Sequence, residues 1–160
     1  MVEEVKSIVD ANKCDKFLTE LIMDERKYND AIDEDIVITN HFNKMLNDKN
    51  VVLLAYYLDS EIVGYILIRK INKNTCLLDG LYVLEKYRNQ GIANSLLNEA
   101  INRCKKLNVK YIDINVMEKN EIAKHIYKKL NFTEYEIKLR KSIWNKWDWV
   151  IYNRRVSRWK

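Results

Sequence analysis

The chain has 160 residues, a formal net charge of +5 and a hydrophobic content of 48%. These values fit one globular domain over residues 1–160 and exclude disorder as the main description. No apolar run approaches the roughly 18 residues that span a bilayer, and the N-terminus lacks the order of a secretory signal. We therefore expect a cytoplasmic protein without a membrane segment.

Cysteine and histidine are too few and too scattered to indicate a disulfide framework or a zinc site. The three cysteines, Cys14, Cys76 and Cys104, form no C-x-x-C pair. Neither His41 nor His125 has a second ligand at metal-binding spacing. We expect free thiols in or near a core, and no metal.

Helical and strand patterns alternate along the first half of the chain. In chain order they predict a strand over 5–9, helices over 14–26 and 36–47, and strands over 51–57, 61–68 and 76–83. The turn residues 58–60 join two runs rich in β-branched and aromatic residues, which is typical of a hairpin.

The second half predicts a long helix over 91–106, a strand over 111–116 and a helix over 121–130. A strand, a long helix and a further strand in that order require a right-handed crossover and parallel pairing. The end of strand 76–83 and the start of helix 91–106 therefore meet at one edge of the sheet, where ligands of open sheets bind. The fold class is α/β or α+β.

Small or flexible residues occur where the long helix begins. The first helical turn has N–H groups without partners and the positive end of the helix dipole. A pyrophosphate could bind the main chain from Gln90 to Asn94, with charge from Arg88 and close approach at Gly91 and Ala93. The spacing fits neither a P-loop nor a dinucleotide fingerprint, and a tight loop without a ligand is the structural alternative.

Two motifs at the expected separation match those of a known family. Arg88, Gly91 and Ala93 fit the pyrophosphate loop Arg/Gln-x-x-Gly-x-Gly/Ala. A second motif, Asn-x-x-Ala-x-x-x-Tyr-x-x-Leu-Gly-Phe, is matched by Asn120, Ala123, Tyr127, Leu130 and Phe132. Asn131 stands where glycine is usual, and asparagine tolerates the same left-handed conformation. From about 51 to 132 the chain resembles the GCN5-related N-acetyltransferase (GNAT) family.

The resemblance implies a single-domain α+β fold with a central mixed, mostly antiparallel sheet, splayed at the acetyl-CoA site and flanked by about four helices. It implies an acetyl-CoA-dependent N-acetyltransferase. The residues that it assigns to acetyl-CoA are Leu81, Tyr82, Val83, Arg88, Asn89, Gln90, Gly91, Ile92, Ala93, Asn94 and Asn120. An N-cap of the helix from Glu121 is an equally physical role for Asn120.

Two residues are candidates for catalysis. By its place in the motif, Tyr127 resembles the acid that protonates the departing thiolate, and a buried aromatic is the alternative. The base is open, because Asp79 is either functional or an ion-pair partner and the next strand offers Asn115 and Glu118. By strict alternation, Asp79 shares a strand face with Leu81.

An acidic segment over 24–35 is the candidate acceptor site. Its carboxylates, which include Asp24, Glu25 and Asp30, would attract a cationic amine such as a polyamine, an aminoglycoside or a lysine side chain. A solvated helix end or loop explains the same acids. Acetylation of a protein or peptide amine or of aminoacyl-tRNA is the alternative reaction.

The last 24 residues carry a net charge of +7 and contain Trp144, Trp147, Trp149 and Trp159. Aromatic residues among basic ones can bind nucleic acid, so a non-catalytic nucleic-acid-binding module is the rival interpretation. Residues 149–152 also predict a final strand that closes the sheet or forms a homodimer interface. We place this structural interpretation first.

Overall fold

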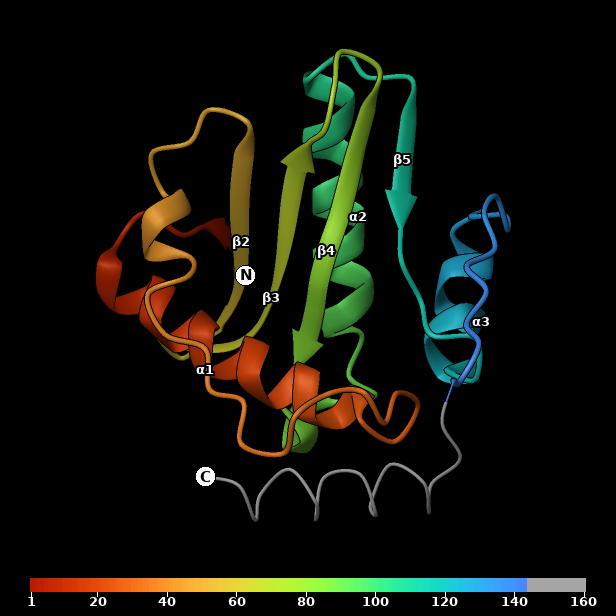
Figure 1. Ribbon diagram of the computed structural model, residues 1–160. Helices are drawn as coiled ribbons and strands as arrows, with labels where there is room; N and C mark the ends of the chain where they lie inside the picture. Colours follow the sequence, from red (N-terminus) through yellow and green to blue (C-terminus); the bar gives the residue numbers. More distant parts are fainter. Residues whose placement is uncertain (144–160) are drawn as a thin grey trace. The chain divides into compact units, whose positions relative to one another are not determined.

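The computed structural model describes residues 1–143 (Figure 1). These residues divide into two units, one over Met1–Tyr127 and one that begins at Lys128. The predicted strand over 149–152 and the four tryptophans lie outside the described residues. No helix in the described part is long and apolar enough to cross a membrane.

Strands and helices follow one another much as the periodicities predict. The strands are β1 (Val2–Glu4), β2 (Val51–Leu58), β3 (Glu61–Lys70), β4 (Thr75–Val83) and β5 (Tyr111–Ile114). The helices are α1 (Ile8–Glu25), α2 (Ile92–Lys106) and α3 (Glu121–Lys129), with short 3-10 turns η1 (Asn43–Met45) and η2 (Glu85–Tyr87). In the second unit, residues 130–143 form neither helix nor strand. Asn131 has a φ of 64°, so it does adopt the left-handed conformation.

One five-stranded sheet has the order β1-β2-β3-β4-β5. The pairs up to β3–β4 are antiparallel, and only β4–β5 is parallel. The parallel pair follows from the α2 crossover between these two strands. The predicted mixed, mostly antiparallel sheet is therefore confirmed.

The sheet is covered on both faces, by α1 on one and α2 on the other (Figure 1). Phe17 of α1 packs in one cluster with the inward side chains of β2, β3 and β4, including Tyr65 and Tyr82. On the α2 side, Leu96 and Leu97 are fully buried. Burial of both faces explains the nearly continuous apolar run of β3.

The predicted strand over 5–9 is wrong. Ser7 caps α1 instead, and its side chain accepts a hydrogen bond of 3.0 Å from the Asp10 N–H. A capped helix can begin at Ile8, six residues before the predicted start, while β1 forms earlier, over Val2–Glu4.

The predicted helix over 36–47 is also wrong, and only η1 forms there. Main-chain N–H groups of this segment donate to side chains of α1 instead of to carbonyl groups of a helix. The buried Asp15 carboxylate accepts bonds from His41 (3.1 Å) and Phe42 (3.0 Å), and the Thr19 hydroxyl accepts one from Ile38 (2.9 Å). Residues 1–143 consequently contain three α-helices rather than about four.

Candidate functional site

The two halves of β4 have different neighbours. Residues 75–78 pair with β5, and the pairing ends at Leu78–Ile114. β4 continues to Val83, beyond the end of β5 (Figure 1). Residues 79–83 therefore present one edge without a strand partner among residues 1–143, which confirms the predicted splay. An extended ligand with amide groups could pair with this edge.

A β-bulge interrupts β4 within this free half. Tyr65 pairs with Tyr82 and Leu67 with Asp79, so two residues of β4 oppose the single residue Ile66 of β3. Gly80 is one of these two and has a φ of +70°, a conformation that glycine adopts without strain. A Cβ at Gly80 would lie 2.9 Å from the Tyr65 hydroxyl.

The bulge corrects the predicted face of Leu81. Asp79 opposes Leu67 and Tyr82 opposes Tyr65, and these partners belong to the same buried cluster on the α1 side. Leu81, directly before Tyr82, therefore points to the other face. The row that strict alternation predicts, with Asp79 and Leu81 on one face, is broken by the extra residue.

The loop after β4 turns directly into α2. η2 occupies Glu85–Tyr87, and the residues between it and α2 alternate in conformation, with left-handed φ values at Asn89 (60°) and Gly91 (78°). The described residues contain no acceptor for the N–H groups of residues 89–94. Main-chain N–H groups of this kind at a helix start form an anion-binding concavity. The predicted pyrophosphate residues are thus brought together.

Gly91 is open on its side-chain side. A Cβ built there would meet no atom within 4 Å. Its role is therefore to allow the left-handed turn and to leave space beside the free N–H groups. Both this space and the free edge of β4 fit acetyl-CoA, an extended chain of amides that carries a pyrophosphate.

The Arg88 side chain faces the protein. Its Nε donates to the Val83 carbonyl (2.9 Å), and its Nη2 donates to Asp24 at the end of α1 (2.9 Å). The guanidinium also lies 5.4 Å from the centre of the Tyr82 ring. Arg88 thus ties α1 to the end of β4 and occupies the main-chain carbonyl of Val83, one of the residues that the resemblance assigns to acetyl-CoA.

Tyr127 lies on α3. Burial, with a smaller contribution from the charge of Glu25, raises the pKa of its phenol to about 12. The hydroxyl is therefore protonated throughout the physiological range. The Asn120 side chain accepts a bond of 3.2 Å from the Ala123 N–H, so Asn120 does serve as the N-cap of α3.

Asp79 is an ion-pair partner in the structure. Its Oδ2 lies 2.7 Å from the Arg69 guanidinium on β3, and both side chains are about 40% exposed. Arg69 was not among the site residues predicted from the sequence. Only the pairing of β3 with β4 brings these two residues, ten positions apart, together.

Further acids line the last turns of α1. Besides Asp24, held by Arg88, they include Glu20, whose Oε2 accepts a bond of 2.6 Å from the Tyr82 hydroxyl. Glu25 is half-buried, whereas Asp30 is exposed in the following loop. Glu20 was not among the site residues predicted from the sequence, although its position one helical turn before Asp24 was a usable signal.

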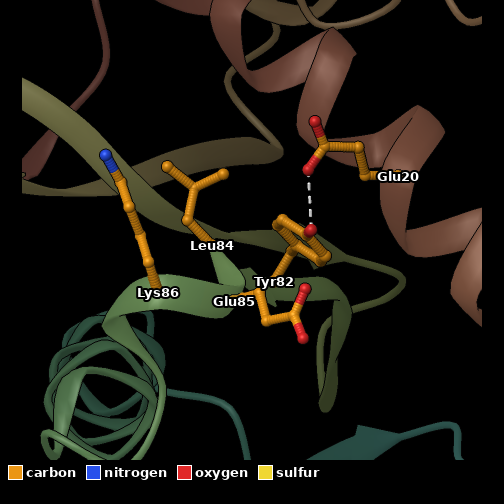
Figure 2. A pocket seen from close by; sticks show the side chains of 5 residues that line it. All are labelled: Glu20, Tyr82, Leu84, Glu85 and Lys86. Atoms are coloured by element: carbon orange, nitrogen blue, oxygen red, sulfur yellow. Dashed lines mark hydrogen bonds between the residues drawn. The ribbon is translucent and has the colours of Figure 1, made fainter.

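A hollow of about 500 Å³ adjoins this end of α1. Figure 2 shows its five lining residues, with the hydrogen bond between Glu20 and Tyr82. Leu84, Glu85 and Lys86 complete the lining from the loop after β4. The hollow therefore has an acid on each side and lies next to the free half of β4.

Solved structures share this architecture. A mutant of the BH1408 protein from Bacillus halodurans matches with a TM-score of 0.79 and 18% identity, over 90% of this chain and 99% of that one. A possible acetyltransferase from Clostridium difficile 630 matches with 0.70 and 22%, over 89% and 95%. The aminoglycoside antibiotic 6'-N-acetyltransferase AAC(6')-IG from Acinetobacter haemolyticus matches with 0.59 and 18%, over 91% and 99%. At these identities the likeness shows the fold.

The family assignment comes from the sequence itself. The model of the acetyltransferase (GNAT) family matches residues 16–132, which is most of the chain and includes both motifs and the free half of β4. Members of this family use acetyl-CoA as the acetyl donor, in agreement with the free strand edge and the N–H groups at the start of α2. The chain therefore belongs to the GNAT family of acetyl-CoA-dependent N-acetyltransferases.

Proposed function

We propose that this acetyltransferase acts on a cationic primary amine of the polyamine or aminoglycoside kind. The observation that carries the proposal is the row of acids on α1 beside the free half of β4, with Glu85 across the hollow. Carboxylates in a hollow attract and orient cations. An acceptor with several amino groups could place one at β4 while another contacts Glu20 or Glu85.

The chain supplies two main-chain surfaces for acetyl-CoA. The edge of residues 79–83 binds the amide-containing arm, and the N–H groups of residues 89–94 bind the pyrophosphate. Acetyl-CoA supplies an activated acetyl group as a thioester. An N–H near Leu81 stabilises the negative charge that develops on the carbonyl oxygen.

Tyr127 is proposed as the acid that protonates the departing sulfur. Its pKa of about 12 keeps the phenol protonated at neutral pH, so a proton is available there. Asn120 supports this role indirectly, because it caps the helix on which Tyr127 lies.

The first test is thiol release from acetyl-CoA with spermidine, an aminoglycoside, a lysine peptide and an aminoacyl-tRNA. Thermal shifts with acetyl-CoA are measured on the same samples, because a ligand of the folded state raises thermal stability. Release with spermidine or the aminoglycoside supports the proposal. Release only with the peptide or the tRNA assigns another acceptor, and release with none contradicts the proposal. The name of the neighbour from Acinetobacter haemolyticus motivates the aminoglycoside arm.

The second test concerns Tyr127. Replacing Tyr127 by Phe removes a proton donor and little volume, so we expect kcat to fall on the order of 100-fold while the Kd of acetyl-CoA stays the same. Calorimetry and steady-state kinetics measure the two quantities. Tyr111→Phe is the matched control, since Tyr111 is 64% exposed on β5. An unchanged kcat in Tyr127→Phe would remove Tyr127 from the acid role.

A further inference from the structure

Four acids of α1 and β4 lie around the free half of β4, and three of them have a partner, while the fifth acid nearby, Glu85 of η2, is exposed. Asp79 is paired with Arg69, Asp24 with Arg88, and Glu20 with the Tyr82 hydroxyl. The described part of the chain offers no hydrogen-bond or ion-pair partner to the carboxylate of Glu25. A carboxylate held by arginine is a poor proton acceptor, whereas an unpaired, half-buried one is available.

Glu25 is placed at the reacting end of the site by its neighbours. It is the last residue of α1, and the adjacent Asp24 is tied by Arg88 to the loop that follows β4. After burial, the charge of Glu25 contributes to the raised pKa values of Tyr127 on α3 and Tyr65 on β3. The charge of Asp79 contributes in the same way to the raised pKa of Glu25. Glu25 therefore lies near the candidate acid and near the bulge of β4.

A second observation points to a polar ligand at this place. The Tyr65 side chain is fully buried, and its hydroxyl has no hydrogen-bond partner within residues 1–143. This hydroxyl is directed at the bulge, 2.9 Å from where a Gly80 Cβ would be. An unsatisfied buried hydroxyl is costly, so it indicates a site that a polar group from outside the chain completes.

We propose that Glu25, and not Asp79, is the general base, a proposal that rests on the proposed function. The acceptor ammonium gives a proton to the Glu25 carboxylate and becomes a neutral amine. Its nitrogen bonds to the thioester carbon as the carbon–sulfur bond breaks. The sulfur takes the Tyr127 hydroxyl proton, the surplus proton on nitrogen restores the phenol, and Glu25 releases its proton to solvent.

The charges around Glu25 determine the pH dependence. Burial raises the pKa of its carboxyl, and the negative charge of Asp79 raises it further. Tyr65 and Tyr127 are neutral, Asp24 adds negative charge from the same helix, and Arg69 offsets part of the Asp79 charge. Activity should therefore fall as pH falls through this raised pKa, at higher pH than for an ordinary carboxyl group.

The test compares variants of the full chain with the amine that the wild type prefers. We expect Glu25→Gln to lower kcat at least about 100-fold, to abolish the acidic limb of the kcat/KM profile, and to leave the Kd of acetyl-CoA unchanged. Glu25→Asp should recover part of kcat. Glu3→Gln, on edge strand β1, is the matched control and should behave as wild type.

Loss of folding can be separated from loss of the base. Since ionising Glu25 is harder in the folded protein, its neutral replacement removes a cost and should not lower Tm at neutral pH. Asp79→Asn should keep the acidic limb and shift it to lower pH, because it removes a charge that raises the pKa of Glu25. Loss of the limb in Asp79→Asn, or its persistence in Glu25→Gln, overturns the proposal. A wild type that acetylates no amine is a different result, which overturns the proposed function as well.

Discussion

The two halves of β4 differ in their pairing and in their role. In residues 75–78 both edges are paired, and Cys76 and Leu78 are buried in the core. In residues 79–83 the pairing with β3 continues across a bulge, while the edge toward β5 has no strand partner among the described residues. The comparison shows that the paired half holds the sheet together so that the other half can leave main-chain groups for a ligand.

The largest effect should come from filling the bulge. Gly80→Val places a branched side chain at a φ of +70° and within 2.9 Å of the Tyr65 hydroxyl. We expect a loss of about 3 kcal/mol in the free energy of unfolding, from strain and overpacking together. Urea denaturation measures this. If Gly80→Val loses no more free energy of unfolding than Gly91→Val, the bulge is not crowded.

Gly91, at the start of α2, tests the effect of a left-handed backbone without the crowding at Gly80. Gly91→Val has the same backbone strain but no atom to displace, so we expect a stability loss of only about 1–2 kcal/mol. The side chain would instead fill the space beside the free N–H groups. We expect the Kd of acetyl-CoA to rise on the order of tenfold, which is about 1.4 kcal/mol. Calorimetry that finds the wild-type affinity would contradict the placement of the pyrophosphate.

Arg88 should give the smallest effect on stability. Arg88→Gln removes a partly exposed ion pair and a bond to the Val83 carbonyl, for which we expect about 1 kcal/mol. Arg103→Gln is the matched control, because Arg103 also makes two hydrogen bonds, in its case to the carboxylates of Glu99 and Glu4. Both should lose similar stability in denaturation, but only Arg88→Gln should alter the KM of acetyl-CoA. If the two variants have the same KM for acetyl-CoA, Arg88 does not shape the loop between β4 and α2.

Features of the fold that depend on periodicity or on local motifs could be predicted from the sequence. The strands of the hairpin and the helix that begins after Gly91 follow from patterns within single segments, whereas the splay beside that helix was implied only by the resemblance to the family. The segment 36–47 could not be predicted in this way, because Asp15 and Thr19 take its N–H groups from a distance in the chain. The pairing of Asp79 with Arg69 likewise depends on strand register.

The acid at the reacting end was the hardest part to predict. The sequence offered Asp79 as the candidate base and placed Glu25 only among the acceptor-site acids, whereas the partners Arg69, Arg88 and Tyr82 set Asp79, Asp24 and Glu20 apart from Glu25. Two of these partners come from positions more than sixty residues away. Spacing along the chain carries no information about such contacts, whereas packing of α1 across the end of β4 creates them.

The extra residue at the bulge also changes how relatives should be compared. Up to Asp79, odd positions of β4 face α1, while beyond Gly80 it is the even position Tyr82 that does so. A relative without the bulge would have one residue fewer in this strand. A single-residue gap in an alignment of β4 would then mark the place where the alternation of side chains between the two faces shifts by one residue, rather than a shortened loop. Odd-numbered residues before and after this place would point to opposite faces of the sheet.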